Sequence, residues 1–156
     1  MIIAQKKRKE NIIEYLLYMF QIEDSIRACN LNISEINEKL VRQYKVDSET
    51  KITIQEWYSD LLSLMKKENI EKHGHLQVIK NQIDEVNSLH LWLLQQPEMV
   101  DYRKLYNNSR SYLLEYQQKV KSTFEAEVEI GLNSLYSFVL IRLKQKNIEE
   151  ATKLAL

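Results

Sequence analysis

The chain has 156 residues, 44% hydrophobic and 28% charged, which is ordinary for a globular domain and leaves no room for two independent cores. We therefore predict one domain over residues 1–156. Lysine and arginine together number 22, as do aspartate and glutamate, so no net charge draws the chain to nucleic acid or a membrane. Any electrostatic argument depends on local clusters.

Segments that would direct the chain into a membrane or out of the cell are not apparent. The apolar start, Met1 to Ile3, is short, and basic residues follow it rather than precede it. The longest charge-free stretch, Gly131 to Ile141, falls far short of the roughly 20 apolar residues that span a bilayer. We expect a cytoplasmic protein without membrane association, in which the lone Cys29 is a packed or half-exposed thiol.

Few residues interrupt helical structure, because the chain has only two glycines and one proline. A first helix is predicted from about Ala4 to Cys29, where Asn30 and Asn32 break it. Asn32 and Glu35 have the spacing of a capping box, which predicts a short second helix to about Tyr44.

The same spacing recurs at Thr53 and Glu56, where a third helix is predicted to begin. Its apolar stripe ends near Gly74, a residue type that often follows a helix. A fourth helix is predicted from Leu76 to the boundary before Pro97, because the residue before a proline disfavours the α conformation.

A fifth helix is predicted over Met99–Val120. Ser122 and Glu125 make a further capping box before a sixth helix, which is apolar on nearly every side from Leu132 to Leu143 and is expected to be the most buried. A last short helix can begin at Asn147. We therefore predict an all-α fold, an irregular antiparallel bundle of five or six main helices with a central apolar helix near the C-terminus.

Common catalytic motifs are missing from the sequence. Two widely separated glycines cannot form a phosphate-binding loop or a nucleophile elbow, and one cysteine excludes zinc ribbons and dithiol redox chemistry. His73 and His75 flank Gly74, but no third metal ligand is visible nearby. We predict no cofactor and no metal. An enzyme with an unfamiliar catalytic motif stays an open alternative.

Five polar residues occupy positions where a helix would bury apolar ones. Glu23 and Arg27 fall inside the apolar arc of the first helix and can pair, and Asp24 at its edge can share the same arginine. His90 lies on the apolar face of the fourth helix, one turn after Asn87. One interpretation is a structural ion pair that covers a short helix or a loop, with His90 a satisfied core histidine. The other is a polar pocket between the first and fourth helices, because burying unpaired charge is costly.

A stripe of tyrosines marks the fifth helix. Tyr102, Tyr106, Tyr112 and Tyr116 fall within about a third of its helical wheel. Such a stripe is typical of a core edge or a protein interface, and less often of a base-stacking platform. We predict a homodimer or another protein partner at this face. The predicted function is a non-enzymatic interaction or regulatory protein, with a small-molecule-binding protein or enzyme as the alternative.

Four basic residues, Lys6 to Lys9, lie near the start of the first predicted helix, where cations oppose the helix macrodipole. A solvated, partly frayed terminus is one interpretation. A salt-dependent contact with an anion or a nucleic acid is the other, although nucleic acid is disfavoured by the neutral net charge.

Several short motifs, spread over most of the chain, carry a resemblance to one family. They are the run from Glu10 to Asp24 with Ile26-Arg27-Ala28, Glu56-Trp57-Tyr58, Gly74-His75-Leu76, Leu89-His90, Leu135-Tyr136 and Leu140-Ile141-Arg142-Leu143. In these motifs the chain resembles an uncharacterised all-helical domain family of Bacteroidetes, a domain of unknown function. The resemblance implies a helical fold in a cytosolic bacterial setting and transfers no activity. Its motifs include Glu23, Asp24, Arg27, His75 and His90 without assigning them a role.

Overall fold

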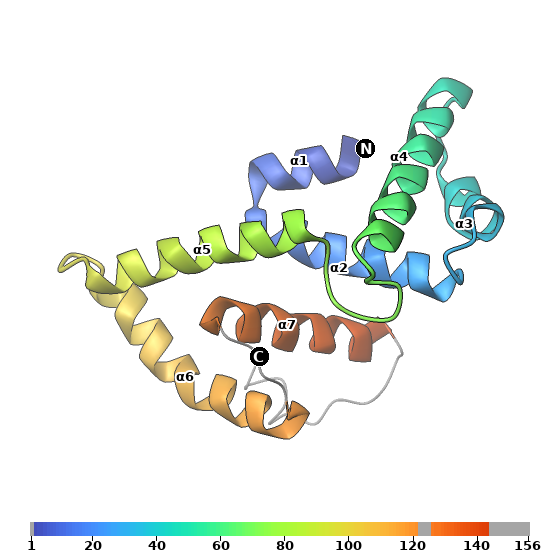
Figure 1. Ribbon diagram of the computed structural model, residues 1–156. Coiled ribbons are helices and arrows are strands. Elements are labelled where there is room, and N and C mark those ends of the chain that lie inside the picture. The colour runs from blue at the N-terminus through green and yellow to red at the C-terminus, as the bar shows by residue number, and fades with distance from the viewer. Residues whose placement is uncertain (1, 122–125, 144–156) are drawn as a thin grey trace. The chain divides into compact units, whose positions relative to one another are not determined.

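The computed structural model describes residues 2–121 and 126–143, and the account below is limited to them. Every regular element in these residues is helical: seven α-helices and one short 3-10 helix (Figure 1). The predicted all-α class is therefore confirmed. By its internal contacts the chain divides into two compact units, Met1–Lys80 and Asn81–Leu156.

The first predicted helix is wrong as a single element, because it is divided at Asn11 into α1 (Ile2–Glu10) and α2 (Ile12–Ala28). Asn11 has an extended backbone, and its side chain accepts hydrogen bonds from the N–H groups of Ile13 (3.0 Å) and Glu14 (3.2 Å). An asparagine side chain competes in this way with the helical hydrogen bonds of its own backbone.

The break at Asn11 also reverses the argument about the basic cluster. Lys7, Arg8 and Lys9 occupy the last turn of α1, where cations complement the macrodipole instead of opposing it. Lys7 is also 2.9 Å from the carboxylate of Glu14. No electrostatic penalty is left at this place to be explained by a bound anion.

The predicted break after Cys29 is confirmed. Asn30 has a left-handed backbone with φ of 52°, which asparagine adopts more readily than most residues. The next N–H group, that of Leu31, donates to the carbonyl of Ile26 at 3.2 Å and closes the end of α2. Cys29 itself is buried, and this burial raises the pKa of its thiol. The expected packed thiol is found.

Asn32 caps α3 (Ile33–Lys39) as predicted, since its side chain accepts from the N–H groups of Ser34 and Glu35. The carboxylate of Glu35 does not complete the capping box. It accepts a hydrogen bond from the ammonium of Lys39 at 2.6 Å, and this contact lowers the pKa of Glu35. The short 3-10 helix η1 (Val41–Gln43) follows.

The helix α4 (Ser48–Lys67) corresponds to the third predicted helix and begins earlier than predicted. Its N-cap is Asp47, not Thr53, and Asp47 accepts hydrogen bonds from the N–H (2.8 Å) and the hydroxyl (2.7 Å) of Thr50. These two bonds hold the pKa of Asp47 below its ordinary value. Thr53 lies inside the helix that Asp47 begins, and its hydroxyl donates to the carbonyl of Glu49.

The end of α4 also differs from the prediction. The left-handed residue is Asn69, with φ of 56°, and the N–H of Ile70 donates to the carbonyl of Met65 at 3.0 Å. Gly74 therefore does not end the helix. It lies in the loop between α4 and α5 with φ of 89°, a conformation that favours glycine.

Three further helices follow this loop. α5 (Gln77–Gln95) ends just before Pro97 as predicted, and it contains the boundary between the two units. α6 (Val100–Val120) is confirmed, and α7 (Glu127–Leu143) is the sixth predicted helix. The predicted capping box at Ser122 and the last short helix from Asn147 lie outside the described residues.

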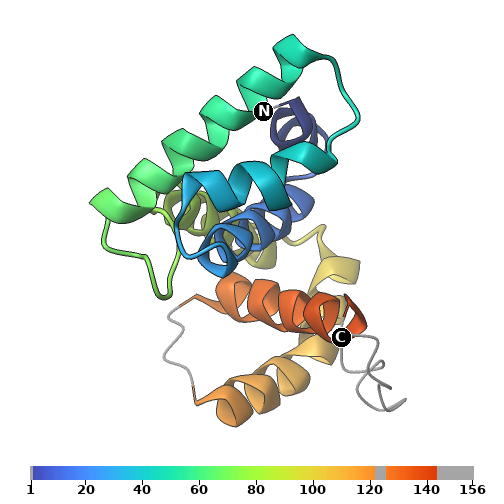
Figure 2. The same ribbon diagram turned by 90° about the vertical axis from the view of Figure 1, so that its right-hand side faces the viewer.

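Within the first unit, α2 contacts both α1 and α4, and α3 packs against α4 (Figures 1 and 2). Within the second unit, α6 and α7 lie side by side. Seven residues of α2 are buried, against four of α7. The prediction that the apolar helix near the C-terminus is the most buried is therefore wrong, because apolar sequence alone does not supply a neighbour that covers it.

Candidate functional site

The first cluster of interest is built by the carboxylate of Glu23, which is fully buried on α2. One carboxylate oxygen accepts a hydrogen bond from the N–H of Leu76 at 2.9 Å, and the other lies 2.6 Å from Nδ1 of His75. The His75 ring stacks on Phe20, with ring centres 3.8 Å apart. Since an ionised carboxylate only accepts, the Nδ1–H of His75 donates to it.

These contacts place negative charge at the start of α5. Leu76 directly precedes this helix, and the N–H of Gln77 donates to the carboxylate of Glu68 at 2.7 Å. The first N–H groups of a helix have no partner inside it and carry partial positive charge. Glu23 and Glu68 together satisfy two of them, so side chains from α2 and from the end of α4 fix the start of α5.

Arg27, one turn after Glu23, holds the loop itself. Its guanidinium donates to the carbonyl of Ile70 from Nε (3.3 Å) and Nη2 (3.2 Å), and also to the carbonyl of Gly74. Nη1 donates to Asp24 at 2.7 Å. The planar guanidinium thus connects α2 to two points of the loop between α4 and α5.

The predicted pairing of Glu23 with Arg27 is replaced by two separate sets of contacts, because each side chain turns to a partner in the loop. Arg27 pairs with the more exposed Asp24, and Glu23 binds His75. We call the set Glu23, Arg27 and His75 the loop clamp. Its polar groups are engaged in holding the loop.

A second cluster lies in the second unit, around the buried His90 on α5. Nδ1 of His90 is 2.7 Å from the hydroxyl of Tyr102, and Nε2 is 3.3 Å from the carboxylate of Glu127. The hydroxyl of Tyr106 donates to both oxygens of that carboxylate at 2.8 Å. We call these four residues, which come from α5, α6 and α7, the histidine–tyrosine cluster.

One assignment of protons satisfies all of these contacts. Nε2 of His90 carries the proton and donates to Glu127, and Nδ1 accepts from the hydroxyl of Tyr102. Both tyrosine rings meet His90 edge to face, with ring centres 5.8 Å away for Tyr102 and 5.1 Å for Tyr106.

The environment of the two phenols differs in its charges. Burial raises the pKa of Tyr102. For Tyr106, burial and then the hydrogen bond to Glu127 raise the pKa, while the guanidinium of Arg110 acts in the opposite direction. Both hydroxyls therefore stay protonated at neutral pH and remain donors within the cluster.

The histidine–tyrosine cluster opens onto a hollow of about 390 Å³. Its lining residues come from α5, α6 and α7 and are His90, Tyr102, Leu105, Tyr106, Ser109, Leu113, Glu127, Val128 and Gly131. A Cβ added at Gly131 would meet no atom within 4 Å, so this part of α7 leaves open space. The hollow combines one carboxylate with aromatic and aliphatic walls.

The cluster joins residues that the sequence predicted separately. His90 belonged to the predicted polar set, and Tyr102 and Tyr106 belonged to the predicted interface. Glu127 was missed, because an acidic residue in the first turn of an apolar helix is ordinary. Asn87, one turn before His90, accepts a long contact of 3.5 Å from the N–H of Val128.

The predicted tyrosine stripe has two kinds of members. Tyr102, Tyr106 and Tyr116 turn their hydroxyls to partners inside the second unit, where Tyr116 donates to the carbonyl of Asn133 at 3.0 Å. Tyr112 is exposed.

The five residues of the predicted polar pocket belong to different units. Glu23, Asp24 and Arg27 lie in the first unit and Asn87 and His90 in the second, each with partners in its own unit. A pocket shared by all five stays a prediction.

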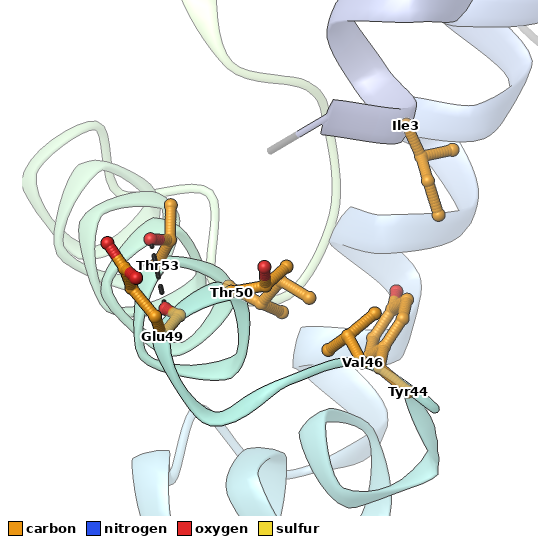
Figure 3. Close-up of a pocket in the computed structure, with 7 residues that line it drawn as sticks. Ile3, Tyr44, Val46, Glu49, Thr50 and Thr53 are labelled. Atoms are coloured by element: carbon orange, nitrogen blue, oxygen red, sulfur yellow. Dashed lines mark hydrogen bonds between the residues drawn. The ribbon is translucent and has the colours of Figure 1, made fainter.

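A different hollow, of about 290 Å³, lies in the first unit beside the start of α4. Figure 3 shows Ile3, Val46 and Tyr44 on one side of it and Thr50 on the other. Both threonine hydroxyls already have partners within α4 and its N-cap. Thr53 donates to the carbonyl of Glu49 at 3.3 Å, and Thr50 donates to the carboxylate of Asp47. The hollow is therefore mainly apolar, and Glu49 is the charged residue in its lining.

Replacing each of the two glycines by alanine is expected to change the free energy of unfolding in opposite directions. Gly74→Ala should lower the free energy of unfolding by about 1–2 kcal/mol, because φ of 89° is strained for a residue with a Cβ. Gly131→Ala should raise it by about 0.5–1 kcal/mol, because it removes a helix-interior glycine where space is free. Urea denaturation followed by circular dichroism measures both. Equal signs would contradict this account of the backbone.

The comparisons with known proteins show a family and no activity. No described helix is long and apolar enough to cross a membrane, and no group of three or more potential metal ligands occurs among the described residues. The chain matches no curated protein and no solved structure. One family model matches residues 1–156, and the chain therefore belongs to the family described as a domain of unknown function, DUF4924.

Proposed function

We propose that this protein is a non-enzymatic interaction protein and that a second copy of the chain binds to the face of α6 that carries Leu105 and Tyr112. The observation that carries this proposal is that none of the 21 residues of α6 is buried. Large apolar side chains are exposed to solvent along this helix, among them Leu105 (69% exposed) and Tyr112 (45% exposed). Exposed apolar surface of this kind is typical of a face that a partner covers.

The positions of these side chains define the interface. Leu105 and Tyr112 are seven residues apart, so they lie on the same face of α6. The other three tyrosines of the stripe bond inside the second unit, which leaves Tyr112 as the tyrosine available to a partner. Aromatic residues combined with leucine suit the core of a protein interface.

A second copy fits this face by symmetry. In an antiparallel pair, a two-fold axis that passes between Asn108 and Ser109 would place Leu105 of each copy against Tyr112 of the other. Such an interface is isologous, because the same patch serves both copies. A cytoplasmic location, one domain over the whole chain and an antiparallel bundle remain part of this proposal.

The test is the oligomeric state of the purified protein. Light scattering after size-exclusion chromatography should show a dimer at micromolar concentration, and Leu105→Glu should weaken it at least about 30-fold, the effect of losing roughly 2 kcal/mol at an interface centre. Leu114→Glu is the matched control. Leu114 is also exposed, at 47%, but lies about 180° away on the helical wheel, since α-helices have about 3.6 residues per turn.

A monomeric wild-type protein at this concentration would contradict the proposal. So would a dimer that Leu105→Glu and Leu114→Glu weaken equally, because a specific face would then not be involved. The second candidate function is ligand binding, and the hollow of the histidine–tyrosine cluster is the specific observation that favours it.

A further inference from the structure

We propose that the hollow of the histidine–tyrosine cluster binds a small organic cation, an alkylammonium or guanidinium group that carries a short apolar body. This inference goes beyond the proposed dimer. Leu105 lines the hollow and also belongs to the proposed interface. It follows from the charge of Glu127, the direction of the hydrogen bonds around it and the nature of the walls.

The carboxylate of Glu127 supplies the charge. Its side chain is 39% exposed, and its partners in the structure are Tyr106 and His90. No lysine or arginine within residues 2–121 and 126–143 forms an ion pair with this carboxylate. Arg110 acts electrostatically on Tyr106 but does not pair with Glu127. Since a carboxylate has about four acceptor positions, Glu127 can accept further N–H donors from a ligand.

The hydrogen bonds of the cluster point in one direction. The hydroxyl proton of Tyr106 and the Nε2 proton of His90 are both donated to Glu127, and that of Tyr102 is donated to His90. The protons of the cluster are thus engaged internally, and the group that remains for a ligand is a negatively charged acceptor. An anionic ligand would meet like charge, whereas a cation with N–H donors would form charge-assisted hydrogen bonds.

The walls favour a cation with an apolar part. Aromatic rings attract ammonium and guanidinium groups through their electron-rich faces. Leu105, Leu113 and Val128 add aliphatic surface, and Gly131 leaves room beside them. The volume of about 390 Å³ falls in the range of roughly 300–1,000 Å³ found for small-molecule sites.

The experiment is an NMR titration of the full chain with n-butylammonium, n-butanol and butyrate, three molecules of similar size and different charge. We expect n-butylammonium to shift the resonances of His90 and Tyr106 and to bind at least about tenfold more tightly than n-butanol, because a hydrogen bond to a charged group is stronger than a neutral one. Butyrate should bind more weakly than n-butanol.

Two variants assign the effect to the hollow. Glu127→Gln keeps the shape and removes the charge, and it should weaken n-butylammonium at least about tenfold. Gly131→Leu places a side chain into the open space and should abolish binding without changing any charge. Asp101→Asn, which changes an exposed acid in the first turn of α6, is the matched control and should leave the affinity unchanged.

The proposal is overturned by any of three results: no shift in the wild-type protein up to about 50 mM n-butylammonium, well above the millimolar dissociation constants of weak complexes; equal affinity for n-butanol; or unchanged affinity in Glu127→Gln. Because every protein is compared at one concentration, a failure of the proposed dimer would appear in its mass and not in these affinity ratios.

Discussion

Replacing Glu23 by alanine should lower the free energy of unfolding by about 3 kcal/mol or more. The carboxylate is fully buried and accepts from the N–H of Leu76 and from His75. Alanine would leave the backbone donor at the start of α5 without a partner in a site that excludes water, and it would also leave a cavity. Both effects act in the same direction.

Urea denaturation, followed by circular dichroism, measures this loss. Glu14→Ala is the matched control, because Glu14 also lies on α2 and pairs with Lys7 at 2.9 Å, but it is exposed and should cost less than about 1 kcal/mol. Glu23→Gln should fall between the two, since the amide oxygen can still accept from Leu76. If Glu23→Ala stays within about 1 kcal/mol of the wild type, the loop clamp does not stabilise the fold.

Arg27→Ala is expected to cost about 2–3 kcal/mol, because charge-assisted hydrogen bonds to the carbonyls of Ile70 and Gly74 are lost together. Arg27→Lys should recover little of this. A single ammonium on a flexible stem cannot reproduce the planar fork that reaches two carbonyls. Arg42→Ala, at an exposed arginine 3.8 Å from Glu38, is the control and should change stability by less than about 1 kcal/mol.

The two positions of the clamp should also be coupled. Glu23 and Arg27 hold the same loop, so once one contact is lost the loop loosens and the second contact contributes less. We expect the double variant Glu23→Ala with Arg27→Ala to cost at least about 0.5–1 kcal/mol less than the sum of the single changes. A strictly additive result would show that each residue stabilises the fold independently of the loop.

Local sequence signals succeeded where a residue acts on its own backbone. Asn30, Asn32 and Pro97 were predicted as helix boundaries and are found there, because a left-handed residue, a capping side chain and a proline all act within one turn. The same kind of signal failed at Asn11 and Thr53. Asn11 follows the polar run from Gln5 to Glu10, where no apolar period marks the end of a helix. Thr53 has capping spacing within a helix that Asp47 begins earlier.

The candidate sites were predicted in part. The sequence identified Glu23, Arg27 and His90 as polar residues on apolar helical faces, and a helical wheel can show this because burial follows the helical period. It did not predict that Glu23 meets His75 or that His90 meets Glu127, since these partners are 52 and 37 positions away. The only signal for Glu127 was its place near the start of a helix.

By itself, therefore, the amino-acid sequence determined the helical class, several helix ends and the unusual polar positions, since each of these follows from interactions within a few residues. The tertiary structure alone decided which partner each polar group has. It turned a predicted ion pair into a loop clamp and brought two predicted tyrosines around His90, because a side chain's partner depends on which distant segments pack against it.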